Sequence, residues 1–150
     1  MQLTEHFSLE EMTASQTATR LGLNNQPGPD EITNLHRVCS ELERVRGMLG
    51  VPLLVSSGYR SIKVNAAVGG SATSAHRFGL AADFTAPRFG NPLAICKAIA
   101  QSDLQFDQLI YEGGNGGWVH LGLASGNSKP RRQVLSWTKG IGYQSGLVLP

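Results

Sequence analysis

The chain has 150 residues, which is enough for one domain, and we expect a single domain over residues 1–150. A hydrophobic content of 41% with 16% charged residues excludes an intrinsically disordered chain. The net charge is only +2, and Arg131-Arg132 is the one adjacent basic pair, so we expect no nucleic-acid partner.

The first half of the chain is predicted to be helical. Ser8 and Glu11 have the spacing of a capping box in HFSLEEM, which predicts a short helix. A longer helix is predicted over residues 31–49, where apolar residues recur at helical spacing. Asp30 is expected to cap this helix and Gly50 to end it.

The second half is predicted to be mainly strands. VPLLVSSGYRS predicts a strand, and Ser61 is expected to cap a short helix through Ala67. GLAADFTAP predicts a second strand, and Asn91-Pro92 begin a helix through about Gln101. FDQLIYE and GWVHLGL are expected to form a hairpin around GGNGG, and QVLSWTKGIGY one last strand. This order predicts an α+β fold with a small antiparallel sheet flanked by helices.

The cysteines, the apolar runs and the first residues indicate where the protein is expected to be found. Cys39 and Cys96 lie in apolar helical patterns and are expected to be buried thiols. No apolar run reaches transmembrane length, so we expect no membrane span. MQLTEHFSLEEM lacks the basic start and the apolar segment of a signal peptide. If the target lies outside the cell, another agent has to deliver the protein.

Three polar side chains point to a metal centre. His120 lies on the strand face opposite the aliphatic residues of GWVHLGL, and Asp83 also points away from the core face of its strand. His76 precedes Asp83 by seven positions in SAHRFGLAADF. Two imidazoles and a carboxylate are a ligand set of catalytic zinc, and the same set also holds Fe(II). A hydrogen-bonded pair without a metal is a further interpretation that spacing alone leaves open.

Four segments resemble the zinc D-alanyl-D-alanine peptidase family. They are SGYRS (57–61), VNAAVGG (64–70), SAHRFGLAAD (74–83) and WVH (118–120). The family includes D-Ala-D-Ala carboxypeptidases, dipeptidases of vancomycin resistance and phage enzymes that cut peptidoglycan stem peptides. HFSLEEMTAS is similar to the start of phage and prophage members. The resemblance covers about residues 50–123 and implies a fold like that of these peptidases and of the hedgehog signalling domain. It also implies His76, Asp83 and His120 as zinc ligands.

The resemblance further implies a general base. Related enzymes commonly carry an acid three positions before the last histidine, where this chain has Gly117. Other members carry the acid at the end of the preceding strand, and Glu112 matches that pattern. We therefore predict Glu112 as the base. Asp107 is the weaker alternative, because an odd spacing of five residues turns it to the opposite face.

Five other residues are predicted to contact the substrate or shape its site. The resemblance implies that Arg60 binds and polarises the substrate, since a guanidinium pairs with carboxylates and carbonyls. Without the motif, we would expect Arg60 to form a surface salt bridge. Ser74 is expected to hydrogen-bond the substrate or steady the site. Tyr59 and Trp118 are expected to line the cleft. Gly79 is expected to let the chain turn between His76 and Asp83.

These observations predict a Zn²⁺-dependent peptidase of peptidoglycan stem peptides, acting as a D,D-carboxypeptidase or an endopeptidase, with a phage endolysin as one form. The alternative is a non-catalytic zinc-containing module that binds the cell wall or belongs to a virion. We expect a monomer made in the cytoplasm of a bacterial host. It would reach the wall by export, by release with a lysis protein or as part of a virion. The bond that is cut stays open.

Overall fold

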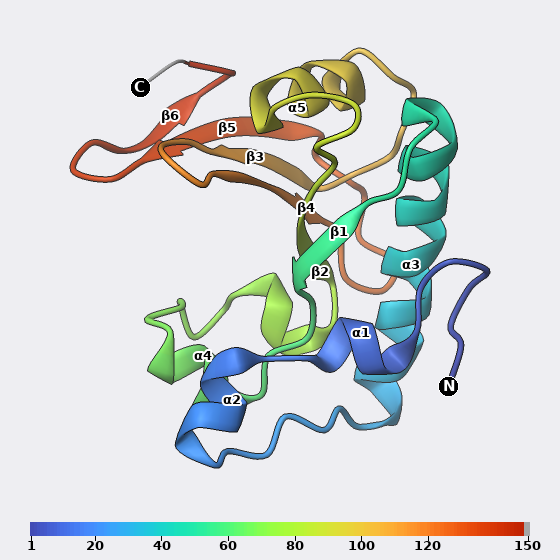
Figure 1. Cartoon of the computed structure of the whole chain (residues 1–150), viewed down its shortest axis with the longest axis vertical. Coiled ribbons are helices and arrows are strands. Elements are labelled where there is room, and N and C mark those ends of the chain that lie inside the picture. Colours follow the sequence, from blue (N-terminus) through green and yellow to red (C-terminus); the bar gives the residue numbers. More distant parts are fainter. Residues whose placement is uncertain (149–150) are drawn as a thin grey trace.

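The computed structural model describes residues 1–148, and Figure 1 shows helices packed around one twisted sheet. The helices, in chain order, are α1 (Leu9–Thr13), α2 (Gln16–Leu21), α3 (Pro29–Leu49), α4 (Ile62–Ala67), the 3₁₀ helix η1 (Ala75–Phe78) and α5 (Pro92–Ala100). The strands are β1 (Leu54–Ser57), β2 (Ala81–Thr85), β3 (Gln108–Glu112), β4 (Trp118–Gly122), β5 (Gln133–Thr138) and β6 (Gly142–Ser145). The α+β class is confirmed.

Helix starts follow local capping chemistry. Ser8 caps α1, and its reciprocal hydrogen bonds with Glu11 complete the predicted capping box. The predicted Asp30 cap of α3 is wrong, because Gly28 is the cap and Pro29 is the first helical residue. Proline suits that position since its φ is preset and the missing N–H has no helical partner there. Asp30 lies in the first turn, where its charge complements the helix dipole.

Within residues 1–148 the strands form one sheet in the order β1-β2-β4-β3-β5-β6. All neighbouring strands are antiparallel except β3 and β5, which are parallel, so the expected all-antiparallel sheet is corrected to a mixed one. Gln108, at the start of β3, pairs with both Gly122 and Gln133. The chain therefore leaves β4 and begins β5 at the same end of the strands. Since β4 is antiparallel to β3, β5 is parallel to β3.

The predicted single last strand is two strands, β5 and β6, joined by a hairpin turn. Gly140 and Gly142 adopt the left-handed φ values of 85° and 91° in this turn. The turn reverses the chain so that Trp137 pairs with Tyr143. The sheet therefore extends two strands beyond the β3–β4 hairpin.

One face of the sheet forms the core. Helices α3 and α5 cover this face, and α5, which lies beside the sheet in Figure 1, packs against β3 and β4. The sheet contributes Ala82, Phe84, Leu109, Tyr111, Val119 and Leu121 to this core. Cys39 and Cys96 are free buried thiols in the same core, as predicted, and burial raises the pKa of each to about 12.

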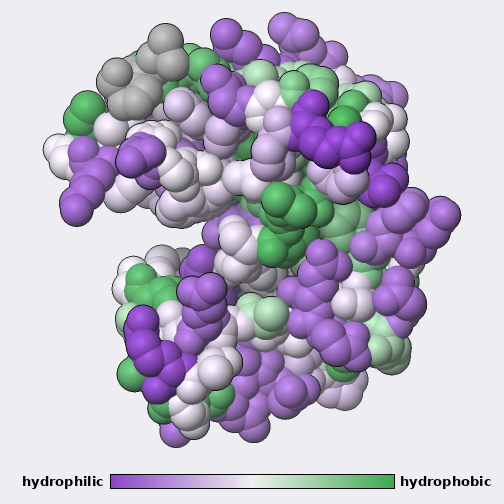
Figure 2. Space-filling model, in the orientation of Figure 1, coloured by the Kyte–Doolittle hydropathy of each residue, from purple (hydrophilic) through white to green (hydrophobic). Residues whose placement is uncertain are grey.

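The opposite face of the sheet borders a hollow. Figure 2 shows this hollow between the part of the molecule that carries β3–β6 and the part that carries α2 and α4. Among residues 1–148, every helix is too short or too polar to span a bilayer.

Candidate metal centre

Asp83 and His120 are brought together by strand pairing. They are direct partners in the antiparallel ladder of β2 and β4, and Oδ1 of Asp83 lies 2.9 Å from Nδ1 of His120. Their sequence neighbours Ala82, Phe84 and Val119 point into the core. Because side chains alternate along a strand, Asp83 and His120 point to the opposite face. This orientation is the one predicted from the alternation of the sequence.

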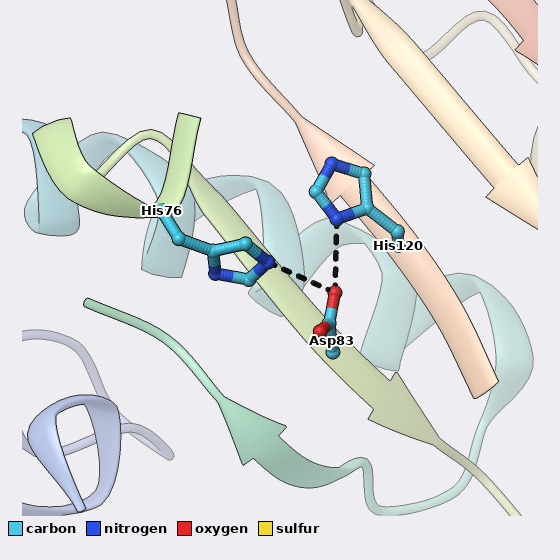
Figure 3. Close-up of side chains that lie close together, drawn as sticks. All are labelled: His76, Asp83 and His120. Carbon is cyan, nitrogen blue, oxygen red and sulfur yellow. Dashed lines mark hydrogen bonds and ion pairs between the residues drawn. The ribbon is translucent and has the colours of Figure 1, made fainter. Parts of the chain in front are cut away.

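His76 reaches the same carboxylate from η1. Its Nε2 atom lies 3.1 Å from Oδ1 of Asp83, and Figure 3 shows both imidazoles converging on this oxygen. Ser74 caps η1, and its Oγ accepts a hydrogen bond of 3.3 Å from the backbone N–H of His76. The Ser74 side chain therefore steadies the turn that carries the first histidine.

Gly79 forms the turn between η1 and β2. It has a left-handed φ of 69°, and a Cβ atom there would lie 2.5 Å from the backbone oxygen of Glu31 in α3. Both the backbone conformation and the close approach of α3 require glycine. The predicted turn between His76 and Asp83 is present.

The three side chains form a compact, buried cluster. One ligand atom of each lies within 4.8 Å of the others. Their exposed fractions are 3% for His76, 5% for Asp83 and 8% for His120. A site this enclosed strengthens electrostatic interactions, because little water screens them.

The hydrogen bonding of His76 fits a bound cation. Nδ1 of His76 lies 2.6 Å from the carbonyl oxygen of Gly58, which can only accept, so Nδ1 carries the proton. Burial lowers the pKa of His76 and favours the neutral ring, whose Nε2 then presents a lone pair to Asp83. Two facing acceptors repel each other unless a positive charge lies between them. Metal-binding histidines have this arrangement, with the second ring nitrogen donating to a carbonyl.

Asp83 is an ionised carboxylate with two separately engaged oxygens. Burial works against its charge, but without a metal the neighbouring imidazoles can supply the positive charge as ring protons that face Asp83, and this attraction holds the pKa of Asp83 below its usual range. Oδ1 faces both histidines, whereas Oδ2 lies 3.3 Å from Nη2 of Arg60. Nε of Arg60 also donates to Oγ of Ser57 at 3.1 Å. Arg60 therefore orients the carboxylate so that Oδ1 remains available to a metal.

Glu112 lies on the same face of the sheet. Its pairing partner in β4 is Trp118, two residues before His120, so the Glu112 and His120 side chains are diagonal neighbours. Burial, together with the negative charge of Asp83, raises the pKa of Glu112 to about 7. A carboxylate with this pKa can exchange a proton near neutral pH.

The hairpin geometry explains why no acid occupies position 117. A Cβ atom on Gly117 would lie 2.4 Å from the backbone oxygen of Glu112. No side chain fits there unless the hairpin moves. The weaker alternative, Asp107, is engaged by Arg131, whose Nε and Nη2 donate to its two oxygens at 2.9 and 2.7 Å.

The remaining predicted residues differ in their surroundings. Trp118 is half-buried on the site face beside Glu112. Tyr59 is 7% exposed and packs in the hydrophobic core, and its contact with substrate stays a prediction. Sequence reasoning missed two supporting groups, the Gly58 carbonyl and the Ser57 hydroxyl. A backbone carbonyl leaves no signal in the sequence, although Ser57 and Gly58 lie inside the SGYRS segment.

Two buried histidines and an aspartate on the open face of an α+β sheet form a cluster that could hold a metal ion, with the ligand types that metal-dependent hydrolases use. Residues 5–122, more than half of the chain, match the family described as Peptidase M15, and the chain belongs to this family. A comparison with curated proteins gives no match. This match confirms the family resemblance inferred from the motifs. M15 peptidases are zinc-dependent in general.

Proposed function

We propose that the protein is a zinc peptidase that hydrolyses an amide bond in peptidoglycan stem peptides. The convergence of His76, Asp83 and His120 on one point carries the proposal. Membership of the M15 family supports peptide hydrolysis. The similarity of SAHRFGLAAD and WVH to the D-Ala-D-Ala peptidases supports the stem peptide as substrate.

Nε2 of His76, Oδ1 of Asp83 and Nδ1 of His120 are the atoms that would hold the metal. Zinc bound there lowers the pKa of a coordinated water to about 7 and polarises a substrate carbonyl. The enclosure of the three ligands keeps bulk water away and sustains this polarisation.

Glu112 moves the proton in the proposed mechanism. Its carboxylate takes a proton from the water that attacks the amide carbon, and the same carboxyl later gives that proton to the leaving amine nitrogen. Both transfers need a pKa near the working pH, and a pKa of about 7 meets that need. The amide C–N bond breaks, and the products are a carboxylate and a free amine.

Arg60 orients both the ligand set and the substrate. Nε of Arg60 donates to Ser57 and Nη2 to Asp83. The guanidinium has further N–H groups that can donate to a substrate carbonyl or carboxylate. Trp118 and Tyr59 are proposed to line the substrate cleft, and Ser74 to hold η1 in place. The chain is proposed to act as a monomeric phage-type or prophage-type enzyme, either a D,D-carboxypeptidase or an endopeptidase.

The proposal is tested by measuring new amino groups released from purified peptidoglycan. We expect release by the zinc-loaded protein, loss of release with a chelator and recovery when zinc is restored. Glu112→Gln should bind zinc normally and release no amine, whereas Glu5→Gln, at an exposed acid, should behave like the wild type. Mass spectrometry of the products then identifies the bond that is cut.

A result with stoichiometric zinc and no amine release from any peptidoglycan preparation would contradict the enzyme. It would instead support a non-catalytic zinc module that binds the wall or belongs to a virion. Equal amine release by Glu112→Gln and the wild type would remove Glu112 from the mechanism.

A further inference from the structure

The site-bearing face of the sheet continues beyond Glu112 onto the β5–β6 hairpin. In the strand register Glu112 pairs with Trp137, and Trp137 pairs with Tyr143. Directly paired residues point to the same face of a sheet. Trp137 and Tyr143 therefore extend the row that begins at the proposed base. Both lie outside residues 5–122, the part that matches the family.

The back of the hairpin is anchored, whereas its front is open. Val134 packs against the core, and the Ser136 hydroxyl donates to the Gly146 oxygen at 2.7 Å and accepts from the Val148 N–H at 2.8 Å. On the front, Trp137 is half-buried and Tyr143 is 62% exposed. Two aromatic side chains are therefore held on a fixed strand pair, with Trp137 partly and Tyr143 mostly exposed in the described part of the chain.

The position of Tyr143 also links it to the site electrostatically. Partial burial of the phenol, followed by the negative charges of Glu112 and Asp83, raises the pKa of Tyr143. In Figures 1 and 2 the β5–β6 hairpin belongs to the upper part of the molecule that borders the hollow, across from α4. A chain lying in this hollow would meet the hairpin as it leaves the metal centre.

We propose that Trp137 and Tyr143 form a platform that binds stem-peptide residues beyond the two that flank the cut bond. This proposal rests on the proposed function and deepens it, because it makes an extended peptide the preferred substrate over a minimal fragment. Aromatic rings offer large, rigid surfaces to peptide groups and methyl side chains, and a tyrosine hydroxyl adds a hydrogen bond. Strand pairing places Trp137 directly beside Glu112 and Tyr143 one strand further on.

The test compares Trp137→Ala and Tyr143→Ala with Ile141→Ala, which removes an exposed apolar side chain from the turn of the same hairpin. Steady-state kinetics are measured on a synthetic pentapeptide stem and on the shortest stem fragment that the wild type cleaves. We expect each aromatic variant to raise KM for the pentapeptide about 10-fold with kcat nearly unchanged. For the short fragment, KM should not change, and Ile141→Ala should match the wild type on both.

Tyr143→Phe separates the ring from its hydroxyl. A KM between those of the wild type and Tyr143→Ala is expected, because the ring surface is kept. Zinc content and melting temperature confirm that each variant is folded. An equal rise in KM for both substrates, or no rise for either, would overturn the platform.

Direct binding distinguishes failure of the platform from failure of the proposed function. Glu112→Gln, loaded with zinc, is titrated calorimetrically with the pentapeptide, alone and combined with Trp137→Ala. A Kd about 10-fold weaker in the double variant supports the platform even if the wild type cleaves nothing. Cleavage by the wild type with equal Kd values in the two variants would overturn the platform and leave the peptidase standing.

Discussion

Asp83 lies directly opposite His120 in the β2–β4 ladder, with Oδ1 of Asp83 2.9 Å from Nδ1 of His120. Two of the three proposed ligands are thus positioned by backbone pairing in the middle of a sheet, which gives more precise geometry than loops provide. His76 comes from a single turn of 3₁₀ helix. Its ring is held by the hydrogen bond to the Gly58 carbonyl, so a change at Gly58 should reach the metal centre.

Gly58→Ala should therefore weaken both folding and metal binding. A Cβ atom at position 58 would lie 2.4 Å from the backbone oxygen of Met12, so the carbonyl that holds His76 must move. Loss of such a supporting contact typically costs about 10- to 100-fold in metal affinity. Zinc titration with a competing chelator measures this change, and thermal unfolding measures the loss of stability.

Gly47→Ala is the matched control for this substitution. Gly47 is an exposed residue of α3, and a Cβ atom there meets nothing within 4 Å. Alanine in a helix interior should stabilise the fold by about 0.5–1 kcal/mol. If both alanine variants kept wild-type zinc affinity, Gly58 would have no part in holding His76.

Removing the metal should lower the stability of the fold. A ligand that binds only the native state adds about 4 kcal/mol at 1,000 times its Kd. For a chain of this length each kcal/mol corresponds to roughly 2–4 °C. We expect a chelator to lower the melting temperature by roughly 10 °C and His120→Ala to abolish the shift. His36→Ala, at an exposed position, is the control and should keep the shift in melting temperature. If His120→Ala also kept the shift, the metal would bind elsewhere.

Activity should rise with pH through the ionisation of Glu112. The base acts only as a carboxylate, and its pKa of about 7 is lowered further by the positive charge of a bound divalent metal. The acidic limb of kcat/KM should therefore fall at or below about pH 7. A profile that is flat between pH 5 and 8 would show that no group of this kind limits the reaction.

Folding stability of the zinc-free protein gives an independent check on Glu112. Its folded-state pKa lies above the ordinary value of 4.5, so the folded chain holds the proton more tightly than the unfolded chain does. The stabilisation from this proton is present below about pH 4.5 and is lost as the pH rises through about 7. Glu112→Gln should therefore gain stability relative to the wild type over that interval.

Strand alternation was enough to place Asp83 and His120 on one face, because a period of two residues determines side-chain direction in any strand. It could not place His76, since η1 has no such period, and only the family resemblance singled it out as a zinc ligand. Helix α2 was missed because its six residues bury only Ala18 and show no apolar stripe. The parallel pairing of β5 was missed because it depends on where residues 123–132 lead the chain, which periodicity does not encode.

Arg60→Lys should lower activity more than it disturbs the fold. A lysine carries one ammonium group and cannot hold Ser57 and Asp83 with the spread of a guanidinium. We expect kcat/KM to fall about 10- to 100-fold at saturating zinc, with a melting temperature close to that of the wild type. Arg20→Lys, at an exposed position in α2, serves as the control. Wild-type kinetics in Arg60→Lys would exclude a role for the guanidinium fork.

The location of the metal tests the account most directly. Crystals of the zinc-loaded protein, measured on both sides of the zinc absorption edge, should give one strong anomalous peak. We predict that this peak contacts Nε2 of His76, Oδ1 of Asp83 and Nδ1 of His120. A zinc-loaded crystal with no peak among these three atoms, or with its peak at another site, would contradict the assignment of the metal centre.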